Sequence, residues 1–323
     1  MAGRLLRFLN FLPAEAKEIL RKQLWQAAAF CGVQILTYCV MTNHFHVLVR
    51  VPPKEDVSDA ELIRRYRLLY PKVTPFTRQH GGGVLAQKPD ETVENIFARG
   101  GSDAERLRAS LYKRMGDVSE FMKTVKQRFS VWFNRTHKRY GTLWSERFKS
   151  VLVEGCPRAL GTLAAYIDLN PVRAGLVQDP KDYRFCGYGE ALGEGNERIR
   201  AGLNFVVESK DWRHTLREYR VILFGKGSEA KYDGSKAGII PWEKAVEVLN
   251  DGGRLPLSTV LRCRVRYFTD GAVLGSQVFV AAALLRYQKT SGRRRRQRGP
   301  RSLTGADWAG LTTMRGLRKG AFG

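Results

Sequence analysis

The sequence is poor in acidic residues for its length. Its 323 residues contain 31 Asp and Glu against 55 Lys and Arg, which gives a formal net charge of +24 at pH 7. This balance favours polyanionic partners, nucleic acid ahead of anionic lipid, because many weak phosphate contacts add up. The alternative is a basic protein whose charge only keeps it soluble. The distribution of the charge along the chain bears on this choice.

Cysteine is also scarce, and the five cysteines are widely scattered with no CxxC pair. An odd number at such spacing argues against a disulfide framework and against a cysteine-based zinc site. The sequence therefore predicts buried thiols in a reducing compartment. These thiols are Cys31, Cys39, Cys156, Cys186 and Cys263.

The sequence predicts no secretory signal and no membrane span. Arg4 and Arg7 interrupt the apolar residues at the N-terminus. The run from Trp25 to Asn43 carries no charge and is about long enough to cross a bilayer. Gly32 splits this run and Gln34 dilutes it, so we interpret it as a buried helix end followed by a strand. We expect a cytoplasmic, nucleoid-associated protein with no membrane partner.

The first candidate site lies in a nine-residue stretch, Thr42 to Arg50. It follows an apolar run, Val33 to Met41, and its first two residues predict a tight turn between two strands. Alternation along the second strand places His44 and His46 on one face and apolar residues on the other. Two histidines at this spacing can share one divalent cation. The alternative is a pair of strand histidines satisfied by their neighbours.

A second pair of polar residues lies on a predicted helix from Arg158 to Leu169. Tyr166 and Asn170 are four residues apart, so they share a face that borders the core. The alternative makes Tyr166 a core-edge aromatic and Asn170 a helix stop before Pro171. Together with the two histidines, however, the pair could form a catalytic site. A tyrosine is a poor nucleophile near neutral pH, and a cation that polarises a phosphate compensates for this.

An Asn side-chain oxygen is a suitable third, hard ligand for Mg²⁺ or Mn²⁺. Attack by Tyr166 on a phosphodiester stores the bond energy as a phosphotyrosine ester. A 3′-hydroxyl can later reverse that step. These four residues therefore suit cutting and rejoining of nucleic acid without ATP.

The predicted elements follow the order helix, strand, strand, helix, strand, helix. This order predicts an α+β, ferredoxin-like sandwich with an antiparallel sheet. The third strand is expected at Arg147 to Glu154. No strand is obvious before the first helix, and only Arg4 to Phe8 remains to supply one. Because those residues alternate poorly, we expect the true start of the protein to lie upstream.

We expect three parts along the chain: residues 1–192 with a long helical insertion at 54–116, a mostly helical extension at 193–285, and a basic tail at 286–323. Arg286 to Lys319 contains eleven Lys and Arg and a single acid, Asp307. Non-specific phosphate binding explains such a run, and a disordered solubilising tail is the alternative. The extension is a second possible DNA-binding region.

Several motifs together resemble a known family. His44-Phe45-His46 matches the His-hydrophobic-His motif of the single-tyrosine HUH endonucleases. Tyr166 to Val177 resembles the signature of the REP-associated tyrosine transposases, and the stretches Gly141 to Lys149 and Asp182 to Tyr188 fit the same family. The resemblance covers about Phe11 to Leu192.

The resemblance implies a ferredoxin-like enzyme, a monomer or homodimer, that cleaves single-stranded DNA next to a hairpin or REP-like palindrome. Within it, His44, His46 and Asn170 would hold Mg²⁺ or Mn²⁺, and Tyr166 would form a 5′-phosphotyrosine. The missing first strand and the long insertion depart from the family. The basic residues expected at the DNA are Arg128, Arg135, Lys138, Arg139, Arg147, Lys149, Arg293, Arg294, Arg295 and Arg296.

Two other functions remain open. A catalytically silent, domesticated protein would keep hairpin binding and lose cleavage, and the missing strand favours it. A phosphodiesterase that uses water would keep the two histidines and have no need of Tyr166. The intact set of His44, His46, Tyr166 and Asn170 favours the transposase-like enzyme.

Overall fold

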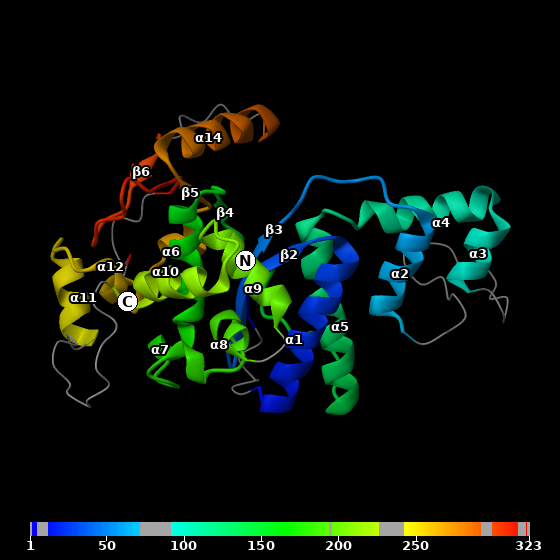
Figure 1. Ribbon diagram of the computed structural model, residues 1–323, viewed down its shortest axis with the longest axis horizontal. Coiled ribbons are helices and arrows are strands. Elements are labelled where there is room, and N and C mark those ends of the chain that lie inside the picture. Colours follow the sequence, from blue (N-terminus) through cyan, green and yellow to red (C-terminus); the bar gives the residue numbers. More distant parts are fainter. Residues whose placement is uncertain are drawn as a thin grey trace. The chain divides into compact units, whose positions relative to one another are not determined.

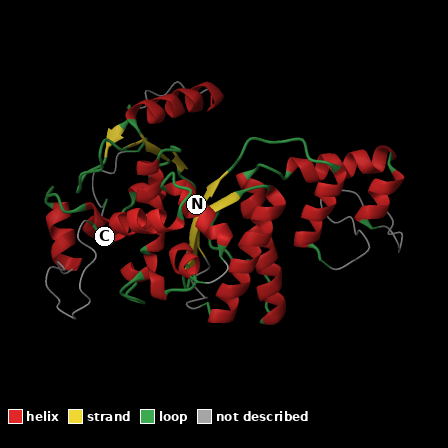
Figure 2. Ribbon diagram, viewed as in Figure 1, coloured by secondary structure: helices red, strands yellow, loops and turns green. Residues whose placement is uncertain are grey.

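The computed structural model describes residues 2–4, 12–71, 92–193, 196–225, 242–291, 299–315 and 321. The chain divides into two compact units. Unit 1 comprises Met1–Pro13, Leu36–Leu48 and Trp144–Gly323, and unit 2 comprises Ala14–Ile35 and Val49–Leu143. Helices dominate both units and the strands are short (Figure 2), so the expected α+β class is confirmed.

The first sheet has the strand order β1-β3-β2, which is that of the first three strands of a ferredoxin-like sheet. A tight turn joins β2 (Gln34–Val40) to β3 (His44–Arg50), as expected from the sequence. The expectation that no strand precedes the first helix is wrong. Strand β1 (Ala2–Arg4) pairs antiparallel with β3, with Ala2 opposite His46 and Arg4 opposite His44.

The predicted position of that first strand was also shifted. Most of Arg4 to Phe8, the stretch considered for it, lies outside the described residues, and the paired backbone comes just before it. Local alternation could not locate β1, because a three-residue strand is defined by its partner rather than by its own periodicity.

The third predicted strand, Arg147 to Glu154, is mostly wrong. Only Leu152–Val153 forms a strand, β4, and it runs parallel to β5 (Val273–Gly275) in a second sheet. That sheet has the order β4-β5-β7-β6, where β6 is Arg301–Ser302 and β7 is Thr312–Thr313. Leu152 is 55% exposed, so the alternation did not mark a buried face. The partner strand lies about 120 residues later, beyond the reach of any local pattern.

Helix α6 begins at a proline and ends before Asn170, and it lies among other helices of unit 1 (Figure 1). Helices α9, α10 and α12 pack against α6, so the C-terminal extension contributes to the same core. The helices are α6 (Pro157–Asp168), α7 (Asn170–Arg173), α8 (Gly187–Leu192), α9 (Glu197–Val206), α10 (Trp212–Phe224), α11 (Trp242–Asn250), α12 (Leu257–Leu261), α13 (Tyr267–Asp270) and α14 (Gln277–Ser291), with the 3-10 helix η1 at Pro180–Asp182.

Unit 2 is helical in its described part, with α1 packed against α5 and α2. As expected, α1 ends at Gly32, whose φ of 64° suits glycine. Asp117 caps α5 by accepting a hydrogen bond from the Glu120 backbone at 2.9 Å. The helices are α1 (Ala14–Cys31), α2 (Asp59–Leu69), α3 (Val93–Arg99), α4 (Gly101–Lys113) and α5 (Val118–Thr136).

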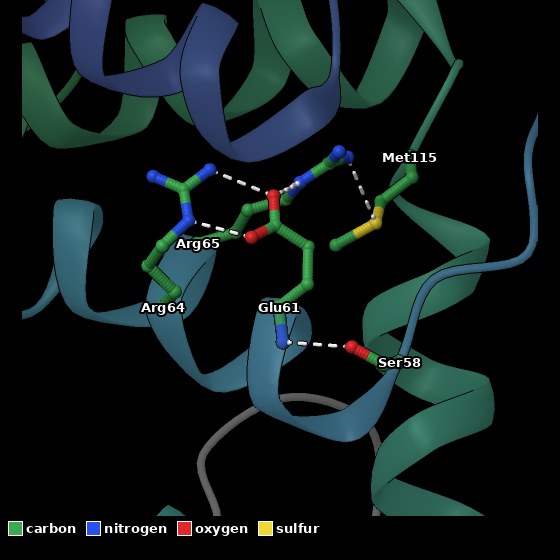
Figure 3. A network of polar contacts seen from close by, with 5 residues as sticks. All are labelled: Ser58, Glu61, Arg64, Arg65 and Met115. Atoms are coloured by element: carbon green, nitrogen blue, oxygen red, sulfur yellow. Dashed lines mark hydrogen bonds and ion pairs between the residues drawn. The ribbon is translucent and has the colours of Figure 1, made fainter.

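The expected helical insertion at 54–116 is confirmed at α2 and α4. Figure 3 shows how α2 is held. The Glu61 carboxylate accepts hydrogen bonds from Arg64 at 2.5 Å and Arg65 at 2.7 Å, which lower its pKa to about 2. Arg65 also contacts the Met115 sulfur at 3.7 Å, which ties α2 to the end of α4. No described helix is long and apolar enough to cross a membrane.

Candidate active site

The two histidines lie side by side on β3. Their ring centroids are 5.1 Å apart and the rings are nearly perpendicular. Phe45 and Val47, which alternate with them, are fully buried, and Phe45 packs edge-on against Trp144 at 5.7 Å. The predicted division of the strand into a core face and a histidine face is therefore confirmed. On the histidine face, the His44 Nδ1 lies 2.7 Å from the Asn43 side-chain oxygen.

Tyr166 lies in the last turn of α6, and only 4% of its surface is exposed. The guanidinium carbon of Arg173 is 3.9 Å from the centre of its ring. The ring of Phe268, from α13, packs edge-on against Tyr166 at 4.7 Å and also contacts Trp308. The sequence predicted that Tyr166 borders the core. It did not predict that the C-terminal extension covers it.

Asn170 begins α7, directly after the tyrosine helix. Its side-chain nitrogen donates to the Ile167 carbonyl at 2.9 Å and to the Tyr166 carbonyl at 3.4 Å. An amide that donates from its nitrogen keeps its oxygen for a hydrogen-bond donor or a cation. The Asn170 side chain therefore contacts the backbone of Tyr166, and the shared face of the two side chains stays a prediction.

Arg173 reinforces this arrangement. One of its terminal nitrogens donates to the Tyr166 carbonyl and the other to the Leu261 carbonyl in α12, both at 2.7 Å. Burial lowers the pKa of this guanidinium, because the low-dielectric interior disfavours its charge. Arg173 thus holds the backbone of Tyr166, covers its ring and joins the end of α6 to the extension.

Asp168 lies between Tyr166 and Asn170 and is completely buried. Its carboxylate accepts hydrogen bonds from the hydroxyl of Thr37 in β2 at 2.9 Å and from the backbone of Tyr188 in α8 at 3.1 Å. The Tyr219 hydroxyl of α10 also donates to it. Burial raises the pKa of Asp168 to about 7, against the effect of these donors. One side chain therefore joins α6 to a strand of the first sheet and to two helices.

Two further tyrosines of unit 1, Tyr183 and Tyr188, have hydroxyls that are engaged elsewhere. The Tyr183 hydroxyl donates to the Val40 carbonyl at 2.8 Å, and burial raises its pKa. The Tyr188 hydroxyl accepts from Arg220 at 2.8 Å, and burial raises its pKa to about 12. Both hydroxyls serve the packing of unit 1.

Sequence reasoning missed Asp168, Arg173, Thr37 and Phe268. One signal was present for the first: an acid inside the apolar helix segment from Leu163 to Leu169 must find donors if it is buried. No local signal pointed to Thr37 or Phe268, which are each about 100 residues or more away from Asp168 and Tyr166 in sequence.

The side chains predicted to hold a metal are of types that suit a divalent cation. Two imidazoles and one amide oxygen give a mixed nitrogen and oxygen donor set. Among the described residues, no three His, Cys, Asp or Glu side chains are grouped so that they could hold a metal ion. A metal site in unit 1 would therefore depend on the amide of Asn170 in addition to His44 and His46.

The basic residues expected at DNA have different settings. Arg128 is partly buried, lies over the Tyr70 ring and donates to Gln26 at 3.3 Å, so it packs within unit 2. Lys149 pairs with Asp270 at 3.7 Å. Arg135, Lys138 and Arg147 are exposed and Arg139 is half-exposed. Arg293, Arg294, Arg295 and Arg296 lie outside the described residues.

Comparison with known proteins bears on the first part of the chain. Residues 10–68 match the family model of the IS200-like transposases. The matched segment contains the hairpin with His44 and His46 and ends within α2, whereas Tyr166 and Asn170 lie beyond it. No curated protein and no solved structure matches the chain. The match shows similarity to the IS200-like transposases over these residues, about a fifth of the chain.

Proposed function

We propose that this protein is a metal-dependent endonuclease and strand transferase of single-stranded DNA, of the REP-associated tyrosine transposase kind. It would act next to a hairpin such as a REP-like palindrome and form a 5′-phosphotyrosine intermediate on Tyr166. The observation that carries the proposal is the set of hydrogen bonds to the buried carboxylate of Asp168. This carboxylate joins α6, the helix of Tyr166 that leads into Asn170, to β2, and the turn after β2 leads directly to His44 and His46.

In the proposed reaction the Tyr166 oxygen attacks a DNA phosphorus and loses its proton. The bond from phosphorus to the 3′-oxygen breaks, a 3′-hydroxyl leaves, and the 5′ end of the other strand segment stays esterified to Tyr166. A later attack by a 3′-hydroxyl reverses the step without ATP. A divalent cation bound by His44, His46 and Asn170 would polarise the phosphate and neutralise developing charge.

The other residues around the site would position the nucleophile. Arg173 fixes the Tyr166 carbonyl, and its guanidinium lies over the ring. Asn170 caps the end of α6 with its nitrogen, so its oxygen is available to a cation.

A second candidate function is supported by one observation. Tyr166 is almost fully covered, and part of the cover is Phe268 of the C-terminal extension. A protein that binds a DNA hairpin without cutting it needs no accessible nucleophile. The domesticated, catalytically silent protein therefore remains the alternative.

A hairpin oligonucleotide labelled at its 3′ end tests these functions, because a 5′-phosphotyrosine keeps the 3′ segment. The full-length protein is incubated with it and Mn²⁺ and run on a denaturing protein gel. The proposal expects a labelled protein band that Tyr166→Phe abolishes while hairpin binding persists. Tyr183→Phe is the matched control and should keep the band.

The other outcomes separate the alternatives. Cleavage without a labelled protein band, unaffected by Tyr166→Phe, would indicate attack by water. Binding without cleavage by the wild type would favour the silent protein. A band that survives in Tyr166→Phe would place the nucleophile at another tyrosine.

A further inference from the structure

The loop that follows α5 in unit 2 holds its residues in a defined conformation. Lys138 has a φ of 49° and Gly141 a φ of 87°, so the chain turns sharply on either side of Tyr140. The Asn134 side chain donates to the Gly141 carbonyl at 2.9 Å, and the Arg139 backbone donates to the Asn134 carbonyl at 2.7 Å. These bonds fasten the loop to the last turn of α5.

The base of the loop is packed by aromatic contacts. The imidazole of His137 stacks on the Phe133 ring at 4.0 Å with an angle of 14° between the planes. Its Nδ1 also lies 2.9 Å from the Phe133 carbonyl. Phe133 is itself buried in unit 2. The loop is thus anchored to the core at one side, and its tip is free to meet a ligand.

Tyr140 stands at this tip with 94% of its surface exposed. The other exposed tyrosine among the described residues, Tyr287, is 44% exposed. Folding gains nothing from an aromatic ring held in water, since the hydrophobic contribution comes from area removed from water. A single exposed apolar side chain does not by itself indicate a binding site. For Tyr140, the charged residues around it give the second observation.

Those surroundings are cationic. From residue 121 to residue 145 the sequence contains no acid and six Lys or Arg. Arg135, Lys138 and Arg139 lie within five residues of Tyr140 in the sequence, and none of the three forms an ion pair with a described residue. An aromatic face beside free cations is the combination by which proteins bind single-stranded nucleic acid: bases stack on the ring and phosphates meet the charges.

We propose that the loop from Arg135 to Gly141 is a binding site for single-stranded DNA, in which Tyr140 stacks on an unpaired base and Arg135, Lys138 and Arg139 contact phosphates. The inference deepens the proposed function, since it assigns a place to the single strand that the enzyme would cut. It does not require cleavage. A duplex offers no free base face, so the ring distinguishes single strands from duplexes.

The test measures binding of the full-length protein in EDTA, where cleavage plays no part, to an unstructured thymidine oligonucleotide and to a blunt duplex of equal length. Tyr140→Ala should weaken single-strand binding by about five- to a hundred-fold, the worth of one stacked base. Tyr140→Phe keeps the ring and should bind like the wild type. Duplex binding should be unchanged in both variants.

Val131→Ala is the matched control, because Val131 is a 63% exposed apolar residue on α5, the helix before the loop, and offers no ring. It should bind both DNAs like the wild type. Replacing Lys138 and Arg139 by Gln should reduce the salt dependence of single-strand binding by about 0.7 log units for each lost contact. Tyr140 makes no core contact, so thermal melting of Tyr140→Ala should match the wild type.

The proposal is overturned if Tyr140→Ala binds single strands as the wild type does. It is also overturned if that variant loses single-strand and duplex binding equally, which would indicate a general surface effect. A protein that passes this test and yet never cleaves DNA would refute the proposed nuclease and leave the binding site standing. If the wild type cleaves DNA and Tyr140→Ala binds single strands as the wild type does, the nuclease proposal stands and the binding site at Tyr140 is refuted.

Discussion

The hydroxyl of Thr37 donates to both carboxylate oxygens of Asp168, at 2.9 and 3.0 Å, across 131 residues of sequence. Both groups are fully buried. A buried carboxylate that loses a donor leaves an uncompensated polar group, which costs about 1–3 kcal/mol or more. This bond therefore holds α6 firmly against β2, the strand that leads to His44 and His46 in the same chain.

This connection predicts that Tyr166 acts together with the histidines of its own chain. An exchange of α6 between two copies would break the bonds of Asp168 to Thr37 and Tyr219. We therefore expect that a mixture of His46→Ala and Tyr166→Phe proteins forms no covalent adduct with the hairpin oligonucleotide. Each variant is first shown to bind DNA. Adduct formation by the mixture, with label on the His46→Ala chain, would show that the tyrosine serves a partner's site.

Asp168 also predicts a pH dependence of stability. Burial raises its pKa from 3.8 to about 7, so the folded protein holds this proton more tightly than the unfolded chain. Stability from this group is fully present below about pH 4 and is lost as the pH rises through about 7. Asp168→Asn has the same shape and cannot ionise.

We expect thermal midpoints of Asp168→Asn to change less between pH 4 and pH 7 than those of the wild type. The shift in pKa sets an upper limit of about 4 kcal/mol on the difference. Tyr38→Phe is the matched control, because it removes a hydrogen bond from the next residue of β2 to Glu190 and leaves Asp168 intact. Parallel curves for Asp168→Asn and the wild type would contradict the raised pKa.

Elements with strong local periodicity could be predicted from the sequence. The hairpin that carries His44 and His46 and the helix that carries Tyr166 were both located to within a few residues. Strand β1 and the second sheet could not, because strands of two or three residues depend on partners far along the chain. The same limit applied to the site. Spacing brought Tyr166 and Asn170 together, whereas the donors to Asp168 come from β2, α8 and α10.

A metal-dependent reaction predicts unequal effects of the three proposed ligands. His44→Ala or His46→Ala removes one of only two imidazoles, so cleavage should fall below detection in Mn²⁺. Asn170→Ala removes one oxygen and the cap of α6, and we expect a smaller loss, on the order of 10- to 100-fold. Cleavage of the labelled hairpin at several Mn²⁺ concentrations measures all three.

His214→Ala serves as the control for these variants, since His214 is exposed near the start of α10 and should leave cleavage unchanged. Partial rescue of Asn170→Ala by higher Mn²⁺ would mark the loss as one of metal affinity. Undiminished cleavage by the wild type in EDTA would refute the metal requirement.

The cover over Tyr166 leads to the last prediction. An attacking oxygen must reach a DNA phosphate, and the 4% exposure of Tyr166 leaves little room for one. Phe268, which belongs to the C-terminal extension, packs its ring edge-on against Tyr166 and is part of this cover. The ring of Phe268 also packs edge-on against Trp308. Phe268→Leu keeps an apolar side chain but removes the ring, so we expect adduct formation at saturating DNA to rise several-fold.

Phe268→Leu should be less harmful to the fold than Phe268→Ala, which would cost about 3–5 kcal/mol out of a total stability of about 5–15 kcal/mol. Phe279→Leu is the matched control, because Phe279 packs against the cluster of Val273, Val280 and Leu284 elsewhere in the extension. It should lower stability to a similar degree without raising the rate. If Phe268→Leu leaves the rate unchanged while both variants melt alike, then the ring of Phe268 does not limit access to Tyr166, and the nucleophile reaches DNA by a movement of its own helix end.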